Sequence, residues 1–319
     1  LGVEFALPDG ERVCFGGKAP GGDGLDLLGV VTGSEGLLGV VVEATVRILP
    51  KPPVTRTLLA AFHAVPDTGV CVANITSAGI VPAAMEFMDR RCIEAVETYC
   101  APGYPKSKAI LIIDVDGLPM EVADNVMRIS DIARASGAHE VREASDERER
   151  ERLWKGRKAA FSAMGRLAPD MLCMDGTIPR RALPHVLARI AEMSNEYGLG
   201  FCNVFHAGDG NIHPLIIFDV MRPGELERAE AFGAEILRLC VQVGGVLTGE
   251  HGVGIEKRDL MPEMFSDADL AQQQRLKCTF DSAGLLNPGK VFPTLSACIE
   301  QGHAHVKRGQ MRHAELPRF

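Results

Sequence analysis

The chain has 319 residues, of which 46% are hydrophobic and 24% charged, an ordinary composition for a globular protein with a sizeable core and room for two domains. Its formal net charge of −8, with no run rich in Lys and Arg, argues against a nucleic-acid partner. No stretch of the sequence reaches the roughly 20 apolar residues that a membrane-spanning helix needs.

The nine cysteines are scattered along the chain, without a Cys-x-x-Cys pair, and their number is odd. Disulfide frameworks and iron–sulfur sites use paired or clustered cysteines instead. The pattern therefore predicts reduced thiols and a cytoplasmic enzyme.

Residues 1–52 are predicted to be rich in strands. Residues 4–15 form two alternating runs around Asp9-Gly10, the pattern of a β-hairpin. A Gly-rich loop follows over 18–26, and a strand of β-branched residues is predicted over 39–49. The prolines at 50, 52 and 53 mark the end of this part.

Beyond the prolines, strands and helices alternate. Strands are predicted over 55–62, 83–88, 109–115, 139–143, 173–178, 200–206 and 212–218. Helices are predicted over 67–78, 89–98, 120–136, 145–165, 179–197, 224–243 and 270–280, the first with Asp67 as its N-cap. This alternation predicts an α+β fold with ferredoxin-like halves.

Two short Gly-rich polar segments each follow an apolar run: His-Ala-Gly-Asp-Gly-Asn-Ile-His-Pro over 206–214 and Thr-Gly-Glu-His-Gly-Val-Gly over 248–254. Together they supply three histidines and two carboxylates, a combination that suits Zn²⁺, Mn²⁺ or Fe²⁺. The spacing of the histidines is neither that of a zinc finger nor that of a metalloprotease. A Gly-Asp-Gly run is by itself usually a turn. The residues alone therefore leave a metal site and a plain turn both open.

The two segments resemble the C-terminal half of the flavoproteins that oxidise D-2-hydroxy acids, a family that includes glycolate oxidases and D-lactate dehydrogenases. The resemblance extends to residues 33–52, 153–157, 175–180 and 287–290, and thus to nearly the whole chain. Residues 173–184 and 315–319 are most similar to the flavoprotein (D) subunits of bacterial glycolate oxidases.

The resemblance implies a domain organisation. Residues 1–52 would end an FAD-binding domain of the vanillyl-alcohol-oxidase type, 53–295 would form the FAD-linked oxidase C-terminal cap domain, and 296–319 would be a tail. An N-terminal portion of the family's proteins would not be part of this chain, which starts at Leu1. We therefore expect the cap to fold, FAD to bind weakly or not at all, and glycolate oxidation to need the additional portion. The strand around Val40–Ile48 would be an unpaired edge prone to association.

The resemblance also implies roles for single residues. His206, His213 and Glu250 would bind a divalent metal that acidifies the substrate hydroxyl, and His251 would be the general base. The alternative for His251 is that it only orients Glu250. Arg157 would hold the substrate carboxylate with its planar fork, although such a charged helix is by default solvated.

Further residues are expected at substrate and cofactor. Asn211 would contact substrate or flavin, or else serve, like Asp209, as a turn residue only. The residues that would contact FAD are Gly33, Ser34, Glu35, Gly36, Gly39, Val40 and Asn287, although Gly-Ser-Glu-Gly is by itself a common turn.

The function implied by the resemblance is FAD-dependent oxidation of glycolate to glyoxylate, with the C2 hydride passing to flavin N5. Electrons would continue to partner subunits, one of them an iron–sulfur protein. The enzyme would be cytoplasmic, or attached to the inner membrane through these subunits. D-lactate is the alternative substrate, because one methyl group in a pocket is worth only about 1–3 kcal/mol. A metal-binding cap without catalysis is the alternative of another class.

Overall fold

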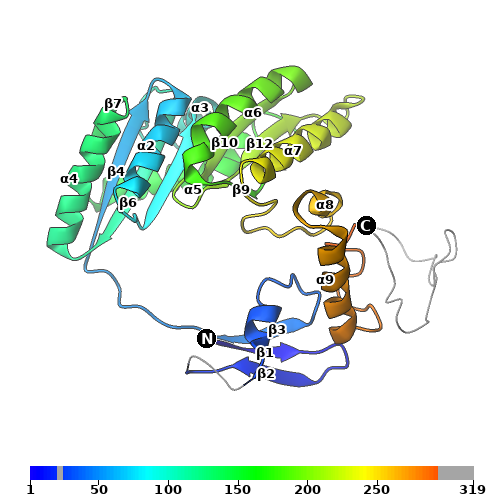
Figure 1. Ribbon diagram of the computed structural model, residues 1–319. Coiled ribbons are helices and arrows are strands. Elements are labelled where there is room, and N and C mark those ends of the chain that lie inside the picture. Colours follow the sequence, from blue (N-terminus) through cyan, green and yellow to red (C-terminus); the bar gives the residue numbers. More distant parts are fainter. Residues whose placement is uncertain (20–23, 294–319) are drawn as a thin grey trace. The chain divides into compact units, whose positions relative to one another are not determined.

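The computed structural model describes residues 1–19 and 24–293. Its contacts divide the chain into two compact units (Figure 1): unit 1 joins Leu1–Leu49 to the residues from Gly252 onward, and unit 2 is Pro50–His251. The predicted domain boundary near residue 295 does not coincide with a boundary between these units. The predicted tail over 296–319 lies outside the described residues.

Unit 1 contains a three-stranded antiparallel sheet in the order β2-β1-β3. β1 (Gly2–Ala6) and β2 (Arg12–Gly16) pair around the Asp9-Gly10 turn, so the predicted hairpin is confirmed. β3 (Val40–Thr45) pairs with β1 and ends four residues earlier than expected. It lies at one edge of this sheet with half-exposed valines, as expected for an unpaired edge.

The remaining elements of unit 1 are helical. α1 (Leu27–Val31) begins at Asp26, whose carboxylate accepts a hydrogen bond from the Gly29 amide at 2.9 Å. The other helical segments are η2 (Arg258–Leu260), α8 (Met261–Met264) and α9 (Asp267–Phe280). α9 starts with a capping box between Ser266 and Asp269, which satisfies the first amides of the helix.

Unit 2 contains a nine-stranded sheet in which every pairing is antiparallel. Its main path runs β7-β4-β6-β5-β10-β11-β9, and β12 pairs with both β10 and β8. The strands are β4 (Val54–Phe62), β5 (Ala84–Asp89), β6 (Ala109–Gly117), β7 (Ala138–Glu143), β8 (Asp170–Cys173), β9 (Gly176–Thr177), β10 (Gly200–His206), β11 (Asn211–Ile212) and β12 (Pro214–Phe218).

The helices of unit 2 are α2 (Val65–Ser77), α3 (Arg90–Cys100), α4 (Pro119–Ala135), α5 (Glu147–Met164), α6 (Leu183–Tyr197) and α7 (Glu225–Gln242), with a 3₁₀ turn η1 (Arg180–Ala182). β4, α2, β5, β6, α4 and β7 form a ferredoxin-like half with the sheet order β7-β4-β6-β5, and α3 is an additional helix between β5 and β6. The β5–β10 pairing joins this half to the rest of the sheet.

Two expectations were wrong in detail. The N-cap of α2 is Ala64, and Asp67 instead lies in the first turn, where a carboxylate favours the helix dipole. The strand expected over 173–178 is split into β8 and β9, because Met174 and Asp175 interrupt it.

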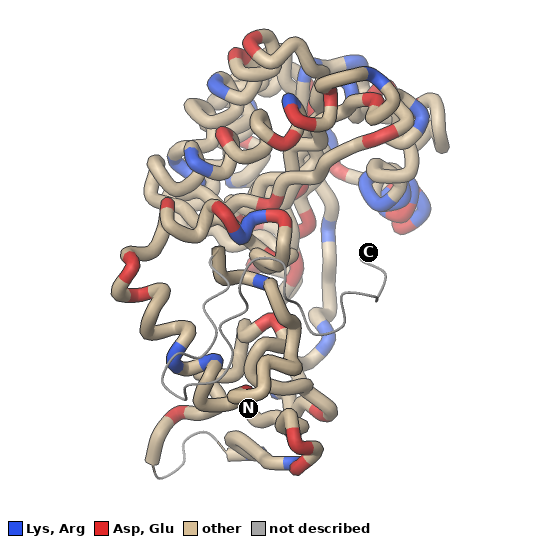
Figure 2. Tube along the Cα trace, turned by 90° about the vertical axis from the view of Figure 1, so that its right-hand side faces the viewer, with Lys and Arg blue, Asp and Glu red and all other residues tan. Residues whose placement is uncertain are grey.

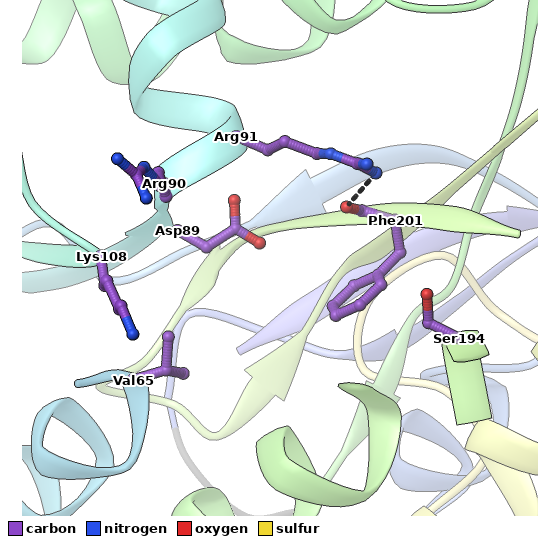
Figure 3. A pocket seen from close by; sticks show the side chains of 7 residues that line it. All are labelled: Val65, Asp89, Arg90, Arg91, Lys108, Ser194 and Phe201. Carbon is purple, nitrogen blue, oxygen red and sulfur yellow. Dashed lines mark hydrogen bonds between the residues drawn. The ribbon is translucent and has the colours of Figure 1, made fainter. Parts of the chain in front are cut away.

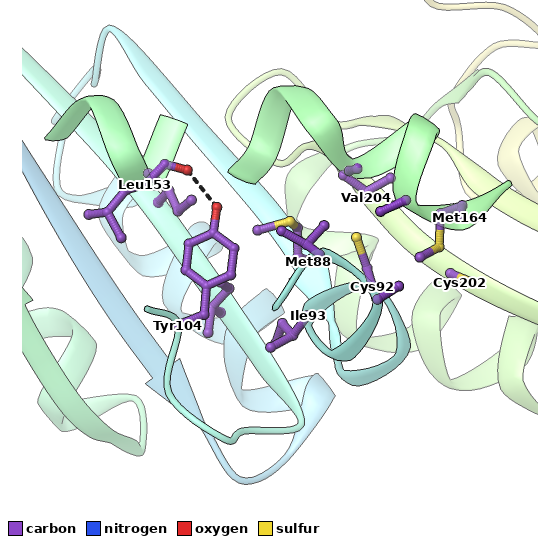
Figure 4. Close-up of a cluster of buried hydrophobic side chains, with 14 of the residues drawn as sticks. Met88, Cys92, Ile93, Tyr104, Leu153, Met164, Cys202 and Val204 are labelled. Atoms are coloured by element: carbon purple, nitrogen blue, oxygen red, sulfur yellow. Dashed lines mark hydrogen bonds between the residues drawn. The ribbon is translucent and has the colours of Figure 1, made fainter. Parts of the chain in front are cut away.

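One hydrophobic core lies between the sheet of unit 2 and the pair α3–α5 (Figure 4). Ile110 and Ile112 of β6 point to this side, while the alternate residues Leu111 and Ile113 are also fully buried. α2 and α4 contact β4 and β6 as well. A sheet covered on both faces explains why β6 has a continuous apolar run instead of an alternating one.

Charged residues of both signs are interspersed along the described chain (Figure 2). Many of them form ion pairs within or between helices, such as Arg189 with Glu196 at 2.6 Å. None of the helices in the described ranges combines the length and the apolar character needed to span a membrane.

Candidate metal and acid–base site

A row of polar side chains crosses four neighbouring strands of unit 2 where β10 ends. Glu86 of β5 lies directly opposite His206 of β10. His206 in turn pairs with Asn211 of β11, which pairs with Thr177 of β9. Because directly paired residues project from the same face of a sheet, the strand register alone brings these side chains together. A cavity of about 350 Å³ opens here, lined by Thr177, His206, Asp209, Asn211, Gly249 and Glu250.

The loop that carries Glu250 and His251 is held by Asp175, the residue that interrupts the expected strand. The Asp175 side chain is fully buried. Its carboxylate accepts hydrogen bonds from the Thr248 hydroxyl at 2.6 Å and from the backbone amides of residues 249, 250 and 251 at 3.1, 3.1 and 3.0 Å. Four donors to one carboxylate fix the backbone from which Glu250 and His251 project.

Gly249 is required by the close approach of this loop to the polar row. A Cβ at position 249 would lie 2.4 Å from Cγ and Oδ1 of Asn211, which no side chain could tolerate without displacing the amide. Asn211 is itself buried, and its Oδ1 has no hydrogen-bond partner within the described residues. An unpaired buried acceptor in a cavity wall fits a bound ligand that supplies a donor.

The hydrogen bonds of the two histidines define which ring nitrogens carry hydrogen. Nδ1 of His206 lies 2.7 Å from Oε1 of Glu86, and Nδ1 of His213 lies 3.1 Å from the Met174 carbonyl oxygen. Carbonyl and carboxylate oxygens only accept, so each Nδ1 donates, and a neutral ring then has its lone pair on Nε2. Burial lowers the pKa of His213, whereas the hydrogen bond to Glu86 raises the pKa of His206.

Both Nε2 atoms face the same carboxylate oxygen. Oε1 of Glu250 lies 3.1 Å from Nε2 of His213 and 3.6 Å from Nε2 of His206. Two lone pairs and an anionic oxygen repel one another unless a proton or a cation lies among them. All three atoms lie within 4.8 Å of one another, close enough for one divalent ion to reach them at about 2.0–2.2 Å. The structure thus brings His206, His213 and Glu250 together as the sequence predicts.

A second grouping, Asp175 with His213 and His251, also lies within 4.8 Å. It fits a metal less well, because the Asp175 carboxylate already accepts four hydrogen bonds from the loop. His251 instead lies beside the first grouping: its ring is near-parallel to that of His213, with centroids 5.2 Å apart, and its Nε2 is 3.9 Å from Oε1 of Glu250.

Arg157 lies on α5 and is buried, so a solvated helix face is the wrong interpretation for this residue. Its Nε and Nη2 contact Oε2 of Glu86 at 2.8 and 2.7 Å. Glu86 was missed in the sequence analysis. The signal that could have found it is a lone carboxylate inside the apolar strand Ala-Met-Glu-Phe-Met over 84–88, because an ion at such a position needs a partner.

The residues expected at FAD lie in unit 1. The Glu35 carboxylate accepts hydrogen bonds from the amides of Val253 and Gly254 at 2.8 and 2.9 Å, and Asn287 donates its Nδ2 to the Glu35 carbonyl at 2.5 Å. The turn over 33–36 and Asn287 are thus brought together. Close packing explains why position 39 is a glycine, since a Cβ there would lie 2.1 Å from the Phe5 ring. FAD contacts at these residues, and at Ser34 and Val40, stay predictions.

A second hollow in unit 2, of about 270 Å³, is lined by Val65, Asp89, Arg90, Arg91, Lys108, Ser194 and Phe201 (Figure 3). The Asp89 carboxylate caps α3 through the Cys92 amide at 3.1 Å and also accepts from the Asn203 amide at 2.5 Å. Burial raises the pKa of Asp89 to about 6. Without a histidine, this hollow lacks the donor set of the first cavity.

Comparisons with known proteins show the family of the chain. Residues 51–291 match the family model "FAD linked oxidases, C-terminal domain". Glycolate oxidase subunit GlcD of Escherichia coli (strain K12) is 50% identical over 320 residues, which cover 100% of this chain and 64% of that protein. D-lactate dehydrogenase of Archaeoglobus fulgidus is 30% identical over 300 residues, covering 92% and 65%.

Among solved structures, p-cresol methylhydroxylase with substrate bound superimposes with a TM-score of 0.70 at 17% identity, covering 91% of this chain and 64% of that chain. At this identity the likeness shows the fold alone, and it confirms the predicted fold class. The chain spans 64% of the length of the E. coli relative.

Proposed function

The chain belongs to the FAD-linked oxidases, and from this premise we propose that it takes part in the FAD-dependent oxidation of a small D-2-hydroxy acid, with glycolate as the substrate and glyoxylate as the product. The observation that carries the proposal is the convergence of two imidazole nitrogens and one carboxylate oxygen beside His251 at a polar cavity. The name of the 50% identical relative favours glycolate within this substrate class.

The donor set of His206, His213 and Glu250 fits a divalent ion such as Zn²⁺, Mn²⁺ or Fe²⁺. When bound, that ion supplies a Lewis acid that lowers the pKa of the substrate hydroxyl, and FAD supplies the acceptor, at N5, for the hydride from C2. The tautomers fixed by Glu86 and the Met174 carbonyl leave the lone pair of each neutral histidine on Nε2, the atom that would bind the ion.

The other residues of the site would bind substrate and move its proton. His251 would accept the hydroxyl proton at Nε2, because that atom lies 3.9 Å from Oε1 of Glu250 and thus beside the position of the ion that would hold the hydroxyl. Asn211 would satisfy its unpaired Oδ1 by accepting a hydrogen bond from the ligand. Arg157 would contact the substrate carboxylate with the part of its guanidinium that Glu86 does not occupy.

D-lactate is the second candidate substrate, because a D-lactate dehydrogenase is 30% identical. Steady-state kinetics of the complete enzyme with each acid decide between them. We expect kcat/KM to be higher for glycolate by about tenfold, the lower part of the range that one methyl group accounts for. A higher kcat/KM for D-lactate would reverse the assignment, and no flavin reduction by either acid would overturn the proposed function.

The name of one relative supports a proposal about partners. The E. coli protein is named a subunit, so we propose that this protein also works within a multi-subunit oxidase. An iron–sulfur subunit that accepts electrons from FAD, and an inner-membrane location through such partners, complete the proposal. Copurification of tagged protein with an iron–sulfur chromophore would support it, and a fully active enzyme without partners would contradict it.

Arg157→Lys in the complete enzyme is expected to raise KM for glycolate by about 10–100-fold, the value of a hydrogen bond to a charged group. The ammonium of lysine keeps the charge, but it is a point charge that replaces a fork. The single ammonium group of the Arg157→Lys variant would then be shared between Glu86 and the substrate. Steady-state kinetics measure the change, with Arg56→Lys as control, because Arg56 binds the Glu143 carboxylate with the same fork on β4 and β7. An unchanged KM would contradict the role of Arg157 as a substrate ligand.

A further inference from the structure

Glu86 is a buried carboxylate that contacts two residues of the proposed site at once. We propose that Glu86 is a positioning residue that couples the metal site to Arg157: one of its oxygens fixes the tautomer of His206, and the other orients Arg157. The proposal rests on the proposed function and deepens it, because one residue that never touches the metal would control both metal affinity and substrate affinity.

The contacts divide cleanly between the two carboxylate oxygens. Oε1 lies 2.7 Å from Nδ1 of His206, and Oε2 lies 2.8 and 2.7 Å from Nε and Nη2 of Arg157. The side chains of Glu86 and Arg157 are 8% and 10% exposed. A carboxylate this deeply buried is costly unless it is paired and hydrogen-bonded, and Arg157 supplies that pairing.

The strand register leaves Glu86 little freedom. Glu86 and His206 are cross-strand partners on β5 and β10, and Glu86 also pairs with Ile112 of β6 on its other side. The backbone of Glu86 is therefore fixed between two strands of the sheet. A side chain on such a rigid element can hold an imidazole in one orientation.

The chemistry of the carboxylate decides the His206 tautomer. A carboxylate offers acceptors only, so Nδ1 of His206 must donate, and the neutral ring presents its Nε2 lone pair toward Glu250. Replacing a residue that hydrogen-bonds to a metal ligand typically changes metal affinity by about 10–100-fold. Because Glu86 also holds two nitrogens of Arg157, the same side chain determines which edge of the guanidinium remains for a substrate carboxylate.

Glu86→Gln keeps the shape of the side chain but replaces one accepting oxygen with a donating NH₂ group. An amide has one accepting and one donating end, so it cannot serve both neighbours. An amide oxygen toward His206 would set the NH₂ against two donors of Arg157, so the orientation with NH₂ toward His206 is favoured. If its NH₂ faces His206, it donates to Nδ1, and the ring hydrogen moves to Nε2, where it blocks the metal. Either orientation loses one of the two functions that Glu86 performs.

The first test measures Mn²⁺ binding to the full 319-residue chain, from the electron paramagnetic resonance signal of free Mn²⁺. Mn²⁺ is used because thiols compete for it less than for softer ions. We expect Glu86→Gln to weaken Mn²⁺ binding by about 10–100-fold. Glu86→Asp, which keeps two accepting oxygens on a shorter arm, is expected to recover part of the affinity. The control is Glu143→Gln, which neutralises a carboxylate paired with an arginine elsewhere in the sheet, in a more exposed place, and should leave the affinity unchanged.

The second test reads the tautomer itself. Long-range ¹H–¹⁵N correlations of the imidazole rings in histidine-labelled, metal-free protein are expected to show His206 with hydrogen on Nδ1, and to show a changed pattern in Glu86→Gln. A purely structural role of Glu86 would not alter this signature. An unchanged tautomer together with unchanged Mn²⁺ affinity in a folded Glu86→Gln variant would overturn the proposal.

Folding failure is avoided by a neutral double variant. Glu86→Met with Arg157→Met removes both buried charges, so neither is left unpaired, and it leaves Nδ1 of His206 without an acceptor, so Mn²⁺ affinity should still be about 10-fold or more below wild type. Wild-type affinity in this variant would also overturn the proposal. Glu250→Gln tests the metal site separately from the role of Glu86: if this variant leaves Mn²⁺ binding unchanged, the metal site of the proposed function is wrong. If it abolishes binding while the Glu86 variants do not, only the role of Glu86 is wrong.

Discussion

Alanine in place of His251 is expected to lower kcat for glycolate by about 10²–10⁴-fold in the complete enzyme, the contribution of a positioned general base. The imidazole lies beside the converging ligand atoms, with Nε2 3.9 Å from Oε1 of Glu250, and it projects from a backbone that Asp175 fixes. A base acts in the transition state, so KM should change much less than kcat. Steady-state kinetics at saturating glycolate measure the effect.

The metal content of the His251→Ala protein separates the two roles considered for this residue. As a base, His251 can be removed while Mn²⁺ affinity stays near wild type, because His206, His213 and Glu250 remain. A loss of Mn²⁺ affinity that matches the loss of kcat would favour the alternative, in which His251 orients Glu250. His185→Ala, an exposed histidine on α6, is the control and should leave both quantities unchanged.

Local patterns predicted most of the secondary structure. The hairpin followed from Asp9-Gly10, and the strands and helices of unit 2 lie within a few residues of the expected ranges, because apolar periodicity reports which face of an element is buried. The two His-containing loops were also visible locally, as Gly-rich polar segments after apolar runs. The predicted ligands His206, His213 and Glu250 converge because β10, β11 and the 248–251 loop meet at one cavity.

The supporting carboxylates could not be predicted in the same way. Asp175 was expected inside a strand, yet it leaves the ladder and turns its side chain to four donors of a loop more than 70 residues later. Glu86 meets His206 through a pairing across 120 residues. Such contacts depend on strand register between distant segments, which no local pattern encodes. The return of residues 252–293 to the N-terminal strands is non-local for the same reason.

Glu250→Gln is expected to weaken Mn²⁺ binding to the chain by more than about 100-fold, beyond the range of residues that act one shell behind a ligand. The change keeps the length of the side chain and its place on the loop that Asp175 holds, but it removes the anionic oxygen on which both histidines converge. Two neutral imidazoles remain, too few for a closed site. Asp209→Asn, in the wall of the same cavity but outside the three converging atoms, is the control and should change the affinity only a few-fold.

In the absence of metal, Glu250→Gln should not lower the stability of the protein. Without a cation, the Glu250 oxygen lies 3.1 Å from the Nε2 lone pair of His213, two acceptors facing each other. A glutamine amide can donate to that lone pair, so the metal-free Tm of Glu250→Gln should equal or exceed that of wild type. Mn²⁺ at about 100 times its dissociation constant should stabilise wild type by about 2.7 kcal/mol and leave the variant unaffected. Thermal unfolding with and without Mn²⁺ measures both effects. A lower metal-free Tm, or an equal Mn²⁺-dependent rise in the variant, would show that Glu250 is a structural residue and that the convergence of the two histidines on it does not serve a metal.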